Sequence, residues 1–370
     1  MSNTFIPVSA PVLAGNEKKY VNECLDEGWI SSNGKFIGRF ESEFAAFCGS
    51  PHAIACCNGT VALHLALLAL GIGPGDEVIV PTVTFVATAN AVHYVGATPV
   101  FADSERATWN LDLADVARKI TPRTKAIIAV HLYGHPADMD ALSALAKQHG
   151  LVLVEDAAEA HGAEVRGRRA GSLGNISTFS FYGNKNLTTG EGGMCLTANA
   201  DLADKMRHLR GQGMDPKRRY WFPIIGYNYR MTNIAAAIGV AQLEKADWHI
   251  GKRREVFAWY HELLADIPGV EWQPTADWAI HACWMFTALL APQFDRDTIA
   301  TRLHADGIET RPVFPPMHLL PPYAHLAAAG SLPIGEDLSR RGLNLPTGAH
   351  VTRADIERVC ERLRAALQPV

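Results

Sequence analysis

Short apolar runs alternate with amphipathic stretches through the first two-thirds of the chain. The apolar runs lie at 52–57, 76–81, 98–103, 126–131, 151–158, 178–181 and 193–197. The stretches between them, such as 60–70 and 138–150, place apolar residues three and four positions apart, and Gly150 is suited to stop the second helix. Continuous apolar runs separated by helices are typical of a buried parallel sheet. The pattern therefore predicts an α/β fold in which helices cover a mostly parallel, seven-stranded sheet.

The pattern changes after about residue 245. A long charged helix is predicted over 245–267 and an amphipathic helix over 352–367, with a Trp-rich strand region over 272–286 between them. We therefore expect a large α/β domain over 1–245, which includes an N-terminal arm, and a small C-terminal α+β domain over 246–370. A length of 370 residues is sufficient for two such domains.

Composition places the chain among folded proteins and argues against nucleic-acid polymers as partners. Hydrophobic residues make up 48% and charged residues 19% of the chain, a balance that disordered chains lack. Lys plus Arg number 34 and Asp plus Glu number 38, so the formal net charge is −4. A chain with this balance offers no basic face to a phosphate backbone, and we expect no binding of DNA or RNA.

The seven cysteines are irregularly spaced and include no Cys-x-x-Cys pair. Neither a metal site nor a disulfide framework is predicted, and most of the cysteines, including Cys56 and Cys57, are expected to be structural. The N-terminus lacks a basic head followed by an apolar stretch, and no apolar run reaches the roughly 18 residues that cross a bilayer. We expect a protein of a reducing cytoplasm without a membrane segment.

Candidate chemistry lies where the predicted strands end, because ligands of open α/β sheets bind beyond the carboxyl ends of the strands. Asn58, Gly59 and Thr60 follow the first strand and open a helix, so their N–H groups could cradle a phosphate; an ordinary helix cap explains the same residues. Asp156 and Glu159 leave a strand that is otherwise almost entirely apolar. They would serve either as partners of a cation or as acidic residues at a helix N-terminus.

One lysine, Lys185, stands among neutral residues in a Gly-rich turn after the strand at 178–181. Most lysines are solvated surface charges, whereas a desolvated lysine has a lowered pKa and can act as an amine nucleophile. Ser180 adds a hydroxyl suited to phosphate. Pyridoxal 5′-phosphate (PLP) needs a lysine for its aldehyde, a carboxylate for its pyridine nitrogen and donors for its phosphate. Lys185, Asp156 and the phosphate cradle together predict a PLP site.

Six motifs extend this interpretation to the whole chain. They are EGWISSNGKFIGRFE (27–41), NGTVALHLAL (58–67), GDEVIVPTVTFVATANAV (75–92), VEDAAEAHGA (154–163), FSFYGNKNLTTGEGGM (179–194) and GYNYRMTNIAAAIGVAQL (226–243). Through these motifs the chain resembles the DegT/DnrJ/StrS family of sugar-nucleotide aminotransferases. The resemblance implies the aspartate-aminotransferase fold, called fold type I, with PLP as the cofactor. It also implies transfer of an amino group from L-glutamate to a keto sugar carried by a nucleoside diphosphate.

Carried over residue by residue, the resemblance assigns roles around the cofactor. Lys185 resembles the lysine that forms a Schiff base with the cofactor and moves the proton between cofactor and substrate carbon. Asp156 is similar to the partner of the pyridine nitrogen, and Phe85 to the aromatic residue stacked on the ring. Glu159 occupies the place of a side chain near the ring hydroxyl, where a carboxylate needs a proton or a donor. The implied phosphate binders are Gly59, Thr60 and Ser180.

Asn228 matches a residue that reaches the phosphate from the neighbouring subunit. The resemblance therefore implies a homodimer with two shared active sites. Nearby, Lys217, Arg218 and Arg219 form a loop suited to a diphosphate, although a surface charge cluster explains them as well.

Further candidates for substrate contacts are Ser31, Arg311 and His318. The last two lie with Tyr323 in a Pro-rich stretch, 311–325, that is too apolar for a flexible linker. This stretch is expected near a site or an interface, and a core role fits its residues equally well.

Four passages narrow the resemblance to enzymes that aminate C4 of GDP-4-keto-6-deoxy-mannose: Glu159, 210–231, 309–325 and 342–347. A dTDP- or UDP-linked keto sugar is the alternative substrate. Family members that remove a sugar hydroxyl carry His in place of the lysine, so Lys185 argues against a dehydratase. A regulatory protein is a third alternative, but neither a helix-turn-helix nor a basic patch is evident.

Overall fold

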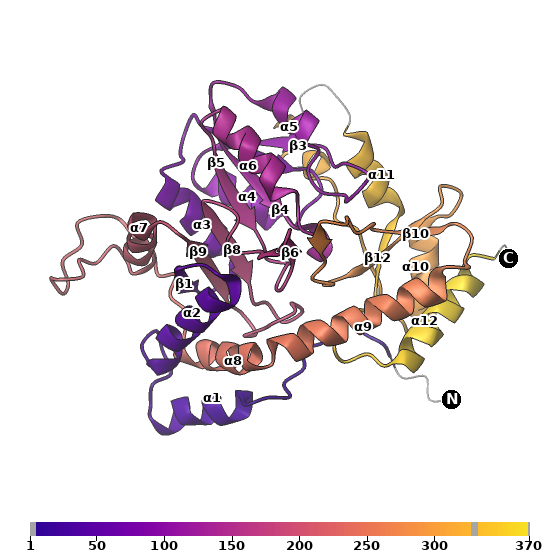
Figure 1. Ribbon diagram of the computed structural model, residues 1–370, viewed down its shortest axis with the longest axis horizontal. Coiled ribbons are helices and arrows are strands. Elements are labelled where there is room, and N and C mark those ends of the chain that lie inside the picture. Colours follow the sequence, from indigo (N-terminus) through magenta and orange to yellow (C-terminus); the bar gives the residue numbers. More distant parts are fainter. Residues whose placement is uncertain (1–4, 327–331, 369–370) are drawn as a thin grey trace.

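The large sheet follows the seven apolar runs of the sequence. The computed structural model describes residues 5–326 and 332–368 (Figure 1). The strand order is β1 (His52–Cys56), β9 (Gly193–Thr197), β8 (Ile176–Ser180), β5 (Val152–Asp156), β4 (Thr124–Val130), β2 (Glu77–Pro81) and β3 (Thr98–Ala102). Only β9 runs antiparallel to its neighbours, and the other pairs are parallel. The predicted fold class, a mostly parallel seven-stranded sheet, is confirmed.

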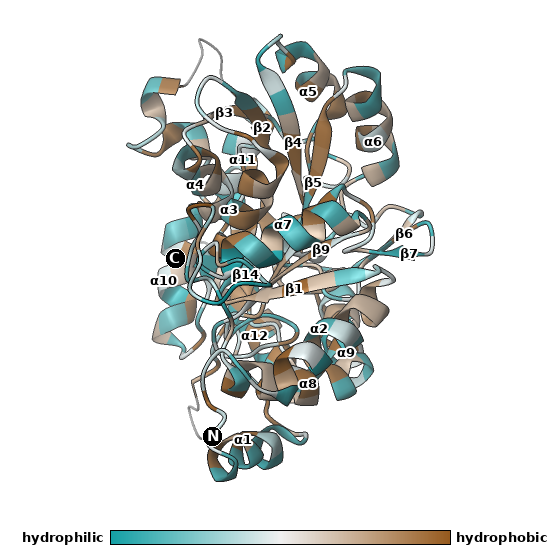
Figure 2. Ribbon diagram, turned by 90° about the vertical axis from the view of Figure 1, so that its left-hand side faces the viewer, coloured by the Kyte–Doolittle hydropathy of each residue, from teal (hydrophilic) through white to brown (hydrophobic). Residues whose placement is uncertain are grey.

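Helices cover both faces of this sheet (Figure 2). They are α3 (Gly59–Leu70), α4 (Ala87–Tyr94), α5 (Leu113–Lys119), α6 (Met139–Gln148) and α7 (Ala200–Arg210), together with α2 (Lys35–Cys48) and α8 (Asn233–Glu244). The N-terminal helix α1 (Glu17–Asp26) packs on α8. Helix α6 ends at Gln148 with His149 as its cap, and Gly150 follows with φ +65°, the left-handed conformation expected of a glycine that stops a helix.

A second, antiparallel sheet lies in the C-terminal third. Its order is β10 (Val270–Trp272), β12 (Phe286–Leu290), β14 (Gly342–Leu345) and β13 (Arg311–Pro312), with helices α10 (Arg296–Ala305), α11 (Pro333–Arg341) and α12 (Arg353–Ala366). The long helix α9 (Ala246–Leu264) begins beside α8 and runs across to α12 (Figure 1). The division into domains at 245/246 falls between α8 and α9 and stays a prediction.

The Trp-rich region predicted as strand forms strand only at its two ends and at β11 (Ala279–Ile280). Strand β11 pairs with β6 (Glu164–Val165), which also pairs with β7 (Arg168–Arg169). The segment before β12 cannot continue as a strand because Cys283 has φ +56°. Its backbone turns toward the end of β4, where Ala282 and Met285 donate to the carbonyls of Gly134 and Tyr133.

The Pro-rich stretch packs against the large sheet as two short 3₁₀ helices, Met317–Leu319 and Ala324–Leu326. Met317 and Tyr323 are buried in the core between α3, α4 and the sheet. Six of the seven cysteines are buried and all seven are free thiols, which fits their predicted core role. Within the described ranges, no helix combines the length and the apolar character needed to cross a membrane.

Candidate active site

Four parallel strands end at the same edge of the large sheet and bring their following residues together. Strands β2, β4, β5 and β8 are neighbours or near neighbours in the sheet. Strands β5 and β8 end at Asp156 and Ser180, and the segments that follow β2 and β4 begin at Thr82 and His131. The predicted site residues Asp156, Glu159, Ser180 and Lys185 therefore share one edge, as the strand order requires.

The side chain of Lys185 lies in a buried position beside two carboxylates. It is 10% exposed, and its Nζ lies 3.9 Å from Oε1 of Glu159, which is almost fully buried. Removal from water lowers the pKa of Lys185, while the charges of Glu159 and Asp156 oppose that shift. The result is an amine that is more easily deprotonated than an ordinary lysine, as a nucleophile or proton carrier requires.

Asp156 sits at the last position of β5 with both carboxylate oxygens occupied. Oδ2 accepts a hydrogen bond of 2.9 Å from Thr88 Oγ1, and Oδ1 accepts one of 3.2 Å from the Ala158 N–H. Burial raises the pKa of Asp156, since two neutral donors replace water only partly. A cationic ring nitrogen would stabilise such a carboxylate, so the position suits the pyridine nitrogen of PLP.

The Glu159 carboxylate was expected to need either a hydrogen-bond donor or a proton, and the structure supplies a donor. Its Oε2 accepts a 2.7 Å hydrogen bond from the backbone N–H of Tyr133, a residue held at φ +56° in the turn after β4. Burial raises the pKa of Glu159 to about 7, although Lys185 and the Tyr133 N–H counteract the effect. Glu159 can therefore exchange a proton near neutral pH.

The start of α3 forms the cradle proposed for phosphate. Asn58 caps the helix by accepting from Val61 N at 3.0 Å, and within the described residues the N–H groups of Gly59 and Thr60 have no acceptor. A Cβ on Gly59 would come within 2.7 Å of the Ser180 Cβ, so only glycine permits this approach of helix and strand. The cap and the anion cradle, posed as alternatives from sequence, are compatible because Asn58 leaves two donors open, and the phosphate role of Gly59 and Thr60 stays a prediction.

An aromatic wall connects Phe85 with Lys185. The ring centroids of Phe85 and Phe314 are 5.9 Å apart. Phe314 stacks on Tyr133 with a centroid distance of 5.3 Å, and the centroids of Tyr133 and Trp284 are 6.1 Å apart. The Trp284 ring centroid is 3.6 Å from Lys185 Nζ. At the open end, Phe85 is 54% exposed, so its face is free to stack on a planar ring. Taken together, the buried amine, the carboxylates, the cradle and this wall fit PLP.

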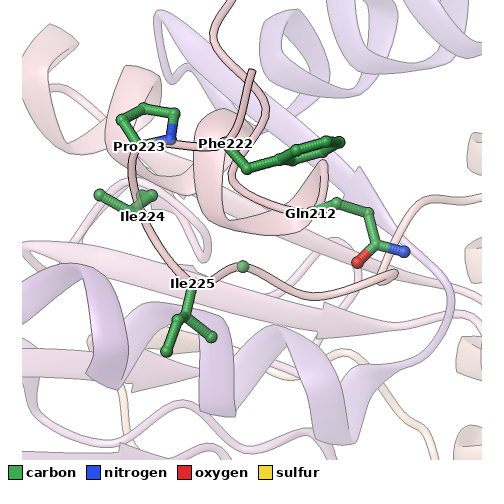
Figure 3. Close-up of a pocket in the computed structure, with 6 residues that line it drawn as sticks. Gln212, Phe222, Pro223, Ile224 and Ile225 are labelled. Atoms are coloured by element: carbon green, nitrogen blue, oxygen red, sulfur yellow. The ribbon is translucent and has the colours of Figure 1, made fainter. Parts of the chain in front are cut away.

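The loop predicted to carry substrate contacts projects from the body after α7 (Figure 1). Asn228, Lys217, Arg218 and Arg219 all lie on it and are exposed. Arg218 stacks on Trp221 at 4.1 Å and Asn228 accepts from Arg230. At the base of the loop, Gln212 and 222–226 line an open hollow of about 570 Å³ (Figure 3).

The remaining predicted residues occupy three different surroundings. Ser31 is exposed, Arg311 pairs with Glu309 at 3.1 Å, and His318 is buried with its ring nitrogens against Thr82 and Glu336. Within 5–326 and 332–368, no hydrogen bond or ion pair joins them or the loop residues to Lys185, Asp156 or Glu159. Their substrate roles stay predictions.

The comparisons with known proteins agree with this geometry. Residues 11–364 match the DegT/DnrJ/EryC1/StrS aminotransferase family. The chain belongs to this family. It is 57% identical to GDP-perosamine synthase of Caulobacter vibrioides, and the match covers 98% of both chains. It is 48% identical to GDP-perosamine synthase of Escherichia coli O157:H7, and that match covers 97% of this chain and 98% of the relative. The crystal structure of DesI in the presence of its TDP-sugar product superposes with a TM-score of 0.92, at 37% identity, covering 99% of this chain and 93% of DesI.

Membership of the DegT/DnrJ/EryC1/StrS family confirms the resemblance drawn from the six motifs, and with it the PLP-dependent aminotransferase class. Three contacts of the site were missed from sequence: Thr88, Tyr133 and Trp284. Thr88 lies one turn after Phe85 in a quoted motif, so its spacing was a usable signal. Tyr133 contributes its backbone N–H, and Trp284 lies far from Lys185 in the sequence. No nearby motif could therefore have predicted either contact.

Proposed function

We propose that the enzyme transfers an amino group from L-glutamate to C4 of a 4-keto-6-deoxy sugar nucleotide, converting GDP-4-keto-6-deoxy-D-mannose to GDP-perosamine. The observation that carries the proposal is the desolvated Lys185 amine, 3.9 Å from Glu159 and on the same sheet edge as Asp156. Relatives named GDP-perosamine synthase at 57% and 48% identity, covering nearly the whole chain, support the choice of sugar.

Each of these residues would have a separate role in the reaction. Lys185 would bond to the cofactor and carry the proton to and from the reacting carbon, because its lowered pKa makes the ammonium group easier to deprotonate. Asp156 would hold the pyridine nitrogen and Phe85 the face of the ring, with Glu159 beside the ring hydroxyl. The phosphate would be held by Gly59, Thr60 and Ser180. When bound, PLP supplies the electron sink that stabilises a carbanion.

We further propose that the functional unit is a homodimer. In the proposed assembly Asn228 of each chain reaches the phosphate bound by the other, and the loop with Lys217, Arg218 and Arg219 holds the diphosphate of the substrate. The proposal is supported by the apolar surface of this loop, since Tyr220, Phe222 and Ile225 are all more than half exposed. We place the enzyme in the cytoplasm, on the route to a lipopolysaccharide O-antigen.

The nucleotide base is tested by parallel assays with GDP-, dTDP- and UDP-linked 4-keto-6-deoxy sugars and L-glutamate. We expect kcat/KM for the GDP-linked sugar to exceed the others by roughly 10²-fold or more, because a site that hydrogen-bonds one base rejects a base that cannot make the same bonds. Amino-sugar formation is followed by chromatography and mass spectrometry. A preference for the dTDP- or UDP-linked sugar would overturn the proposed substrate and leave the aminotransferase class intact.

A further inference from the structure

Arg253 is a buried cation without a carboxylate partner among the described residues. It lies on α9 and is only 3% exposed, whereas the next residue, Arg254, is exposed. Burying an unpaired guanidinium costs folding energy, which is recovered only when its donors are well satisfied. The groups that contact the Arg253 guanidinium therefore indicate the role of this buried charge.

The guanidinium of Arg253 donates only to neutral acceptors, and these join segments far apart in the sequence. Nη1 donates to the carbonyls of Trp284 at 2.8 Å and Thr347 at 3.2 Å. Nη2 reaches the carbonyls of Asn184 at 3.2 Å and Lys185 at 3.3 Å. A fifth contact, at 3.3 Å, is with Oγ of Ser9. The backbone of the reactive lysine is thus tied to α9.

Trp284 contacts Arg253, the Asn184 carbonyl and the Lys185 amine. Its carbonyl accepts from Arg253, and its indole Nε1 donates to the Asn184 carbonyl at 3.0 Å. The face of the same ring lies 3.6 Å from Lys185 Nζ. One tryptophan therefore contacts the backbone and the amine of the lysine segment, and Arg253 fixes that tryptophan.

We propose that Arg253 is a positioning residue, which holds the Asn184–Lys185 backbone and Trp284 so that the Lys185 amine stays at the reacting edge of the sheet. The inference rests on the proposed function only in taking Lys185 as the reactive amine. A displacement of about 1 Å at such a group costs roughly 10²-fold in rate, so this positioning has a large effect on catalysis.

The charge of Arg253 adds an electrostatic consequence. Burial lowers the pKa of Arg253 to about 10, so the group remains protonated at neutral pH. As a like charge it lowers the pKa of Lys185 further, after the larger effect of burial. The titratable and charged groups that face this pair are Asp156, Glu159, His161, His249, Cys283 and His350.

The test uses Arg253→Met, which removes the charge, Arg253→Lys, which keeps the charge on a single nitrogen, and Arg254→Met as the matched control. The pKa of Lys185 is measured in the full-length, cofactor-free protein from the pH dependence of its acetylation by acetic anhydride, read by peptide mass spectrometry. We expect Arg253→Met to shift the midpoint to higher pH, and Arg253→Lys and Arg254→Met to keep the wild-type midpoint.

Steady-state kinetics of the holoenzyme provide the second readout. We expect kcat to fall roughly 10- to 100-fold in both Arg253 variants with KM little changed, and to remain at the wild-type value in Arg254→Met. Wild-type midpoints and kcat combined with a lower melting temperature would show a structural role and overturn the proposal. If Arg253→Met does not fold, Arg253→Lys decides through kcat. If the wild-type enzyme aminates no sugar but the midpoint still shifts, the proposed function fails and the effect on Lys185 stands.

Discussion

Replacing Lys185 with alanine is expected to lower turnover by roughly 10⁴-fold or more, because one amine both bonds to the cofactor and carries the proton. The fold should survive, since Lys185 makes no side-chain hydrogen bond within the described residues and its ion pair with Glu159 spans 3.9 Å. Turnover is measured with L-glutamate and the GDP-linked keto sugar, the cofactor by its visible absorbance, and the fold by circular dichroism.

Lys205→Ala is the matched control for this variant, because Lys205 is an exposed lysine on α7. We expect it to retain the turnover and the visible absorbance of the wild-type enzyme. If Lys185→Ala kept both properties, Lys185 would not be the reactive amine and the assignment of the site would be wrong.

Asp156→Asn is expected to lower kcat by roughly 10²- to 10³-fold, comparable to the loss of a group aimed at charge that develops in a transition state. An amide retains the size of the side chain and can accept from Thr88, but it lacks the charge that keeps a pyridine nitrogen protonated. Each pKa unit lost at that nitrogen is worth roughly 1.4 kcal/mol. Steady-state kinetics at saturating nucleotide sugar measure the loss.

A variant of the neighbouring carboxylate, Glu155, serves as a control that separates a loss of catalysis from a loss of folding stability. Glu155 is fully buried, and its oxygens accept from His131, from Ser177 and from three backbone N–H groups between 171 and 174. Glu155→Gln should destabilise the fold by about 2 kcal/mol in urea unfolding, because buried donors lose a charged acceptor. Asp156→Asn should lower the unfolding free energy less than Glu155→Gln does, because only two donors face the Asp156 oxygens and burial already disfavours the charge of this carboxylate. An unchanged kcat in Asp156→Asn would contradict its role at the ring nitrogen.

The large sheet and the centre of the site could be predicted from the sequence because their signals are local. Each apolar run gives one strand, and parallel strands must end at a common edge, so Asp156 and Ser180 meet without any knowledge of packing. The Trp-rich region was predicted less well. Its apolar residues are buried by contacts with the turn after β4, and the positive φ of Cys283 has no sequence signal.

Residues that act across long sequence separations could not be found in this way. Arg253 lies in a helix whose charged residues resemble a solvated face, and sequence alone does not show that one of them is buried. The peptide N–H of Tyr133 and the carbonyls of Asn184 and Lys185 carry no side-chain identity, yet they determine the hydrogen bonds of Glu159 and Arg253. Backbone donors and acceptors become visible only once the chain is folded.

The central claim is that this chain carries an amino group from one substrate to the other in two separate steps. The direct measurement is the visible absorbance of the cofactor in purified enzyme, first with L-glutamate alone and then, after glutamate is removed, with GDP-4-keto-6-deoxy-mannose alone. We predict that L-glutamate abolishes the absorbance and that the keto sugar restores it, with one amino sugar formed per subunit. An absorbance that L-glutamate leaves unchanged, or that the keto sugar does not restore, would contradict the account.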